Sequence, residues 1–123
     1  MILVDTSVWI DHLHSSEPHL VEVLEGAGVV QHPMIVGELA LGSLKRRTEF
    51  LELMTNMPST RVAASSEVLN LVNARRLYGR GLSLVDAHLL ASVLLTPGTR
   101  LWTRDKRLLA AADGLEISHT DAD

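Results

Sequence analysis

The first four residues constrain the fold more than any other part of the chain. Met1-Ile2-Leu3-Val4 is apolar without alternation and ends at the polar triplet Asp5-Thr6-Ser7. A short β-prone run that is apolar throughout is typical of a strand buried on both faces, as in a parallel sheet. The chain is therefore expected to begin with a strand of such a sheet.

Helix-like and strand-like segments alternate along the rest of the chain. Gly26 and Gly28 are expected to end the first helix, Pro33 suits the first turn of the next, and Pro97-Gly98 closes another. Helices are expected over 18–25, 33–42, 45–57, 65–78, 84–95 and 105–112, and strands over 1–4, 29–30, 61–63, 100–103 and 115–118. This order predicts a three-layer α/β sandwich with a mostly parallel central sheet. The 123 residues, 46% of them hydrophobic and without a repeat or linker, are expected to form a single domain over 1–123.

Several classes of protein are excluded by what the sequence lacks. It has no cysteine, so a disulfide scaffold, a thiol enzyme and a thiolate metal site are ruled out. It also has no GxSxG, no Gly-rich phosphate loop and no HExxH. The longest apolar run, 108–112, is far too short to span a membrane, and no signal-peptide pattern is present. A cytoplasmic protein without a membrane segment is expected.

The charges are distributed unevenly. The net charge is −4, yet no Lys or Arg precedes Lys45, and all eleven basic residues lie within 45–107. Local rather than net charge makes a phosphate-binding surface, so a nucleic-acid partner fits this basic middle segment. The alternative is that the clusters 45–47 and 75–76 are solvated helix faces.

Two carboxylates follow the carboxyl ends of predicted strands. Asp5 follows the first strand, and Asp105 follows the strand over 100–103. Ligands bind at this edge in open α/β sheets. For both residues the alternative role is the N-cap of the helix that follows.

Two further carboxylates lie on predicted helices. Glu38 is the only charged residue between His32 and Lys45, on a helix apolar nearly all round, so it is expected to be buried and to need a partner. Gly37 beside it is taken to mark a close backbone approach, and the alternative for Glu38 is a narrow solvated stripe. Ser83 and Asp86 have the spacing of a capping box, which is the alternative role of Asp86.

Together the four carboxylates, Asp5, Glu38, Asp86 and Asp105, have a chemical logic. Like charges gathered in one pocket take up protons unless a cation lies between them. Oxygen ligands without Cys or a His pair favour Mg²⁺ or Mn²⁺ over Zn²⁺. Such ions activate water and neutralise phosphate oxygens in phosphodiester cleavage.

Four segments carrying these residues resemble the motifs of PIN domains, in order and over nearly the whole chain: Ile2–Ile10, Gly37–Leu39 with Gly42, Asp86–Ala91 and Thr103–Leu108. The size and the lack of a further domain resemble the VapC toxins of bacterial type II toxin–antitoxin pairs. The resemblance implies a Mg²⁺- or Mn²⁺-dependent endoribonuclease that cuts structured RNA, often tRNA or ribosomal RNA. It also implies a homodimer, with higher-order assemblies when bound to a VapB antitoxin whose C-terminal segment covers the active site.

Carried over residue by residue, the resemblance implies that the catalytic carboxylates are Asp5, Glu38, Asp86 and Asp105, with the hydroxyl of Thr103 beside them and Thr6 and Ser7 near Asp5. Because Mg²⁺ keeps several waters and takes one or two carboxylates directly, Asp5 and Asp86 are expected to be the direct ligands. Glu38 and Asp105 would act through water or hold a second ion. The RNA backbone is expected to contact nine basic residues: Lys45, Arg46, Arg47, Arg75, Arg76, Arg80, Arg104, Lys106 and Arg107.

Two other functions compete with this one. A phosphotransfer protein or phosphatase with Asp5 as nucleophile is disfavoured, because the haloacid-dehalogenase pattern needs a second Asp where this chain has Ser7. A catalytically silent PIN-like binding module would be supported by loss of a carboxylate, and all four are present. The histidines show no metal-ligand spacing and are expected at the surface or in turns; they are His12, His14, His19, His32, His88 and His119.

Overall fold

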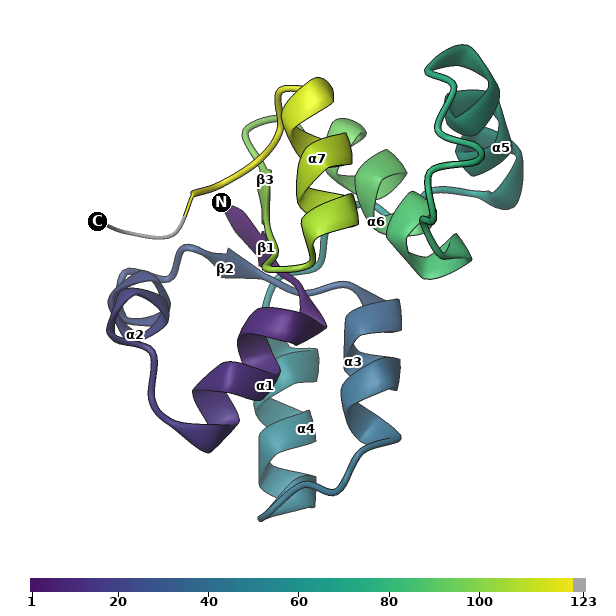
Figure 1. The fold of residues 1–123 in the computed structure, drawn as a ribbon. Helices are drawn as coiled ribbons and strands as arrows, with labels where there is room; N and C mark the ends of the chain where they lie inside the picture. Colours follow the sequence, from purple (N-terminus) through teal and green to yellow (C-terminus); the bar gives the residue numbers. More distant parts are fainter. Residues whose placement is uncertain (121–123) are drawn as a thin grey trace.

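Three parallel strands form the sheet in the computed structural model, which describes residues 1–120 (Figure 1). β1 (Ile2–Val4) lies between β2 (Val29–Val30) and β3 (Arg100–Trp102). Ile2 is in register with Val29 on one side and with Arg100 on the other. The prediction of a buried first strand in a parallel sheet is confirmed, since Leu3 and Val4 are fully buried.

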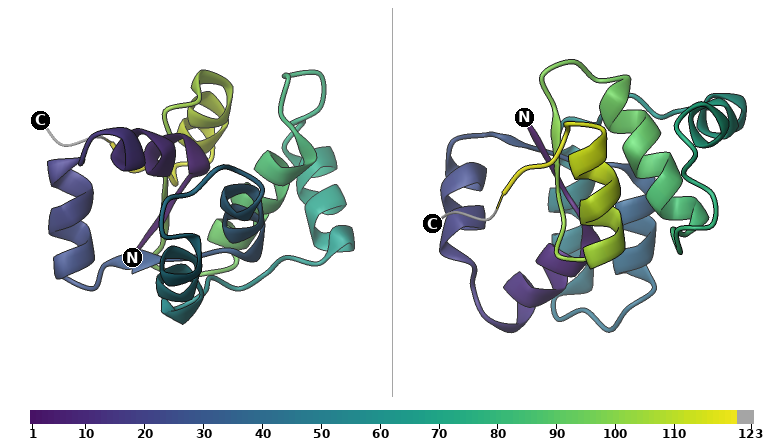
Figure 2. Two further views of the ribbon diagram at one scale, coloured as in Figure 1. Left: turned by 90° about the horizontal axis from the view of Figure 1, so that it is seen from below. Right: turned by 45° about the horizontal axis from the view of Figure 1, so that its top comes forward.

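Helices surround this sheet and complete an α/β sandwich, as predicted. They are α1 (Thr6–His14), α2 (Pro18–Glu25), α3 (Pro33–Ala40), α4 (Arg47–Asn56), α5 (Ser65–Ala74), α6 (Leu84–Leu94) and α7 (Lys106–Gly114). α3 packs against α1 and α4, α5 packs against α6, and α6 contacts β3. α2 and α5 lie at opposite ends of the molecule (Figure 1, Figure 2).

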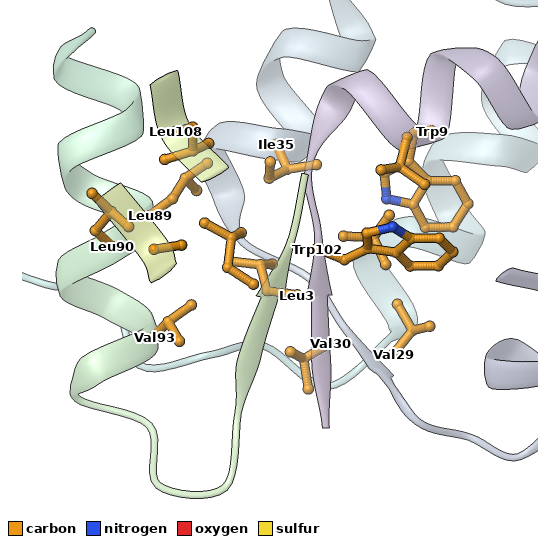
Figure 3. Packing of buried hydrophobic residues seen from close by; sticks show 14 of the residues in the cluster. Leu3, Trp9, Val29, Val30, Ile35, Leu89, Leu90, Val93, Trp102 and Leu108 are labelled. Atoms are coloured by element: carbon orange, nitrogen blue, oxygen red, sulfur yellow. The ribbon is translucent and has the colours of Figure 1, made fainter. Parts of the chain in front are cut away.

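Both faces of the sheet bury apolar side chains, as the unalternating first strand requires. On one side of the sheet, Leu3 faces the α6 residues Leu89, Leu90 and Val93, and Leu108 of α7 lies there too (Figure 3). On the other side, Trp102 lies with Trp9 of α1 and Val29 (Figure 3). The sheet is therefore fixed from both sides, which holds the carboxyl ends of β1 and β3 together.

Two predicted strands are wrong. Residues 61–63 form no strand, and the only pairing in that region is an isolated parallel bridge between Gln31 and Ser59. Residues 115–118 form one bridge, from Leu101 to Ser118, because α7 continues to Gly114 and the chain reaches β3 only at its end. A short β-prone run forms a strand only where another strand lies alongside it. For residues 115–118, the length of α7 determines which residues reach β3.

Several helix boundaries also differ from the prediction. One whole helix, α1, is missing from the prediction: it begins directly after Asp5, where the sequence indicated only a polar turn with capping residues. α4 begins at Arg47 rather than residue 45, because Arg46 has a left-handed backbone (φ 50°). α5 ends at Ala74 rather than at residue 78, because the chain turns at Arg76, which also has a positive φ of 53°. Left-handed conformations at non-glycine residues have little sequence signal.

Candidate active site

Asp5 directly follows β1, and β1 and β3 run side by side and end together (Figure 1). Its side chain is buried, and Oδ2 accepts hydrogen bonds from the Ser7 hydroxyl and the Thr103 hydroxyl, each at 2.8 Å. Asp5 stands at the N-cap position of α1, but its side chain forms no capping hydrogen bond. The alternative role as a helix cap is therefore wrong, because the carboxylate points to β3 instead.

Thr103 connects Asp5 to Asp105. Its buried hydroxyl donates to Asp5 and accepts the backbone N–H of Asp105 at 3.1 Å. Asp105 caps α7, because its Oδ1 accepts the N–H groups of Arg107 and Leu108, both at 3.0 Å. For Asp105 the capping role is confirmed, and it uses only one of the two carboxylate oxygens.

Asp86 lies in the first turn of α6, within the capping box that the sequence indicated. Ser83 Oγ accepts the Asp86 N–H, and Asp86 Oδ2 accepts the Ser83 N–H, each at 3.0 Å. Burial raises the pKa of Asp86, the hydrogen bonds from Ser83 lower it, and the charges of Asp5 and Asp105 raise it. The charges of Asp5 and Asp105 therefore both act on Asp86.

Glu38 joins the site through a neighbouring residue of Asp5. Thr6 donates its hydroxyl to Glu38 Oε1 at 2.9 Å. The prediction that Glu38 is buried is wrong, because this side of α3 is exposed to solvent. Gly37 does not mark a close approach either, since a Cβ there would have no neighbour within 4 Å.

Each of the four carboxylates binds the protein through one oxygen. Within residues 1–120 the other oxygen of each one accepts no hydrogen bond: Asp5 Oδ1, Glu38 Oε2, Asp86 Oδ1 and Asp105 Oδ2. In the same part of the chain no three carboxylate or imidazole groups converge closely enough to enclose an ion. The donor set suits a hard cation that takes one or two carboxylates directly and keeps its remaining waters.

A groove of about 490 Å³ extends from this site between α1 and the segment that joins α3 to α4. Glu38 and Thr6 lie at the end that adjoins the site, and Lys45 also lines the groove. Ile10 and Leu13 of α1 contribute exposed apolar side chains to its wall. The site therefore continues into a surface groove that is part apolar and part charged.

The nine predicted RNA-binding residues fall into two groups. Four already have partners in the protein: Arg46 with Glu49, Arg47 with the Ala40 carbonyl, Arg75 with the Gly114 carbonyl, and Arg104 with Asp11 and Glu17. The side chains of the other five form no hydrogen bond or ion pair within residues 1–120; these are Lys45, Arg76, Arg80, Lys106 and Arg107. The side chains of the second group have no partner within residues 1–120 that an anionic ligand would have to displace.

Arg104, just after β3, links the sheet to the α1–α2 region through two ion pairs. Nη1 binds Asp11 at 2.8 Å and Glu17 at 2.7 Å, and Nη2 binds Glu17 at 3.1 Å. The guanidinium also lies over the Trp102 ring, 5.8 Å from its centroid. Nothing in the sequence indicates these acidic partners beyond the acidic character of residues 1–44.

Replacing Arg104 with Ala is expected to lower the free energy of unfolding by about 2 kcal/mol, because two carboxylates lose a charge-assisted partner. Urea titrations of the wild type and the variant measure this loss. Arg104→Lys is the matched control: it keeps the charge but not the planar fork, so it should recover part of the stability. An unchanged urea midpoint in Arg104→Ala would show that these ion pairs contribute nothing to the free energy of unfolding.

The histidine prediction is wrong for two residues. His32 and His88 are buried, and His32 caps α3 by accepting the Met34 N–H at 3.0 Å. The other ring nitrogen of His32 contacts Ser92 Oγ at 3.0 Å. A buried histidine in a capping position has no distinctive spacing in the sequence, so it could be found only from the fold.

A parallel sheet with Asp5 and Asp105 at its carboxyl edge, and with Asp86 on α6 and Glu38 on α3, fits the comparison with known families. The family model described as PIN domain matches residues 2–114, and the chain belongs to the PIN domain family. Within that family it resembles the VapC proteins. Ribonuclease VapC32 of Mycobacterium tuberculosis, in strains CDC 1551 / Oshkosh and ATCC 25618 / H37Rv, is 56% identical to it over 111 residues, 90% of each protein. The resemblance carried by the four sequence motifs is thus confirmed.

Within residues 1–120, no helix has the length and apolar character needed to cross a membrane.

Proposed function

We propose that this chain is a metal-dependent endoribonuclease toxin formed by one PIN domain over residues 1–123. The observation that carries the proposal is the set of four carboxylates, each held through one oxygen with the other left for a ligand. The similarity to Ribonuclease VapC32 over 90% of both chains supports RNA as the substrate. Metal, carboxylates and phosphodiester chemistry fit together in one site.

The cofactor of this proposal is Mg²⁺ or Mn²⁺, with Asp5 and Asp86 as direct ligands. When bound, the ion supplies an activated water and neutralises charge on the phosphate. Asp5 is suited to the role because the Ser7 and Thr103 hydroxyls fix Oδ2 and so orient Oδ1. Glu38 and Asp105 act through water or hold a second ion. Thr103 orients Asp5 and the start of α7, so its role is positioning.

The proposed substrate is structured RNA, such as tRNA or ribosomal RNA, and cleavage takes place in the cytoplasm. Eight of the nine basic residues remain proposed contacts with the RNA backbone. Arg104 is given a structural role instead, through its ion pairs with Asp11 and Glu17. Lys45 is well placed, because it lines the same groove as Glu38. Phosphate contacts of this kind position the substrate without reading its sequence.

A Lys45/Arg46/Arg47→Ala triple variant is expected to weaken RNA binding and flatten its salt dependence by roughly one unit of slope for each phosphate that the variant no longer binds. Affinity measured against salt in Ca²⁺, which is intended to block cutting, tests this. Arg61→Ala is the control: the Arg61 N–H binds Thr96, just beyond the C-terminal end of α6 and one helix length from Asp86. A triple variant with the wild-type slope would assign these residues to solvent or to a protein partner.

The same proposal includes a VapB-type antitoxin, a homodimer and larger assemblies with the antitoxin. The name of the VapC32 relative supports such a partner. The groove beside Glu38 offers the partner apolar contacts at Ile10 and Leu13 together with the carboxylates. A segment that covers this groove would also block access to the site.

A binding module without activity is the second candidate, and one assay separates the two. Purified chain is incubated with total RNA and Mg²⁺ or Mn²⁺, with EDTA in a parallel sample. The nuclease produces defined fragments only with metal. A silent module retains RNA and leaves it intact under both conditions.

A further inference from the structure

The side chain of Arg107, in the first turn of α7, lies against Gly81 in the segment between α5 and α6. Gly81 lies in the segment between α5 and α6 and has a positive φ of 75°. A Cβ at this position would lie 2.7 Å from Nη1, 2.9 Å from Cδ and 2.9 Å from Cζ of Arg107. The guanidinium therefore occupies the space that any side chain at residue 81 would take.

This contact places a positive charge between the starts of two helices that carry site carboxylates. Gly81 precedes the Ser83–Asp86 capping box by two residues. Arg107 follows Asp105 by two residues, and its N–H binds Asp105 Oδ1. The backbone of Arg107 is thus fixed by one site carboxylate, and its side chain lies against the loop that leads to another.

The Arg107 guanidinium has no neutralising partner in the described part of the protein. Arg104, Arg46 and Arg75 bind partners in the protein, whereas the Arg107 side chain makes no hydrogen bond or ion pair within residues 1–120. The side chain is exposed to solvent, so a ligand can reach it. A planar guanidinium that lies against the segment leading into α6 and is not neutralised is suited to binding a phosphate through two N–H groups.

We infer that Gly81 is a positioning residue: its missing side chain lets Arg107 lie across the loop and bind a backbone phosphate of the RNA beside the carboxylates. This inference rests on the proposed function and deepens it, because it names the Arg107 guanidinium as the group that binds the RNA strand next to the cleavage site. With Gly81 in place, the guanidinium can lie against the segment that leads into α6, and any side chain at residue 81 would compete for that space.

Gly79 provides a matched control within the same loop. It has a positive φ of 70°, close to that of Gly81, but a Cβ there would have no neighbour within 4 Å. Gly79→Ala and Gly81→Ala therefore introduce the same backbone strain. Only Gly81→Ala displaces Arg107, so the difference between the two variants isolates the position of the guanidinium.

RNA affinity is measured in Ca²⁺ at several salt concentrations, and kcat and KM are measured in Mg²⁺. Relative to Gly79→Ala, Gly81→Ala is expected to bind RNA about tenfold more weakly, with a salt slope smaller by roughly one unit. KM should rise while kcat changes little, since a flanking phosphate is bound equally in the ground state and the transition state. Arg107→Ala should show the same changes without any backbone strain.

A double variant completes the test. In an Arg107→Ala background, Gly81→Ala should weaken binding no further than Gly79→Ala does, because the two substitutions remove one contact. Equal affinities and slopes of Gly81→Ala and Gly79→Ala in an active enzyme would overturn this inference alone. So would a Gly81→Ala effect that persists without Arg107. Wild-type protein that neither binds nor cuts RNA would overturn the proposed function and this inference together.

Discussion

Replacing Asp5 with Asn is expected to reduce RNA cleavage by about 10³-fold, equivalent to about 4 kcal/mol of transition-state stabilisation. The Asn carbonyl can still accept the hydrogen bonds of Ser7 and Thr103. The amide nitrogen then replaces Oδ1, so a hydrogen-bond donor that cannot ligate a cation takes the place of the proposed metal ligand. The melting temperature should stay the same or rise, because one negative charge leaves a cluster shared with Asp86 and Asp105.

The cleavage rate and the melting temperature of Asp5→Asn are measured together, and Asp86→Asn is treated in the same way. Titration with Mn²⁺ should show weakened binding in both variants. Glu25→Gln is the charge-matched control, since Glu25 is exposed at the end of α2, outside the site. Unchanged Mn²⁺ affinity in both amide variants would contradict their assignment as ligands. A melting temperature many degrees lower in Asp86→Asn would mean that its main role is the capping box.

Acidification is expected to destabilise the fold through His32, by about 3 kcal/mol between pH 7 and pH 4. Burial, together with the charge of His88, lowers the pKa of His32 from 6.5 to about 4. Nδ1 must stay unprotonated because it accepts the Met34 N–H. The unfolded chain takes up the proton first as the pH falls. The contribution of His32 is therefore complete above pH 6.5 and is lost progressively towards pH 4.

Urea unfolding at a series of pH values between 7 and 4 measures this loss. His32→Asn is the comparison, because Asn also caps a helix but does not titrate. It should be less stable than the wild type at pH 7, since the contact with Ser92 is changed, but it should lose less stability on acidification. Parallel pH curves for the two proteins would show that His32 is not the group responsible.

The parts of the site that depend on local order could be predicted from the sequence. Asp5 and Asp105 directly follow β1 and β3, and parallel neighbouring strands bring such positions to one edge. The Ser83–Asp86 capping box is visible from spacing alone and is formed in the structure. The fold class follows in the same way from the alternation of apolar runs and helix-like segments.

What the sequence could not predict depends on contacts between distant residues. The apolar character of its helix predicts a buried Glu38, yet its partner Thr6 lies 32 residues earlier and Glu38 itself is at an exposed edge of α3. The partners of Arg104 are separated from it by 87 and 93 positions. The space that Gly81 leaves for Arg107 depends on how α7 packs beside the segment before α6, and no motif indicates it.

The most direct test of the central claim is to map the 5′ ends of cellular RNA after a short pulse of expression of this chain, beside Asp5→Asn at the same level. The account predicts new ends at a small set of positions in structured RNA, present with the wild type and absent with Asp5→Asn. No new ends with the wild type, or the same ends with both proteins, would contradict it.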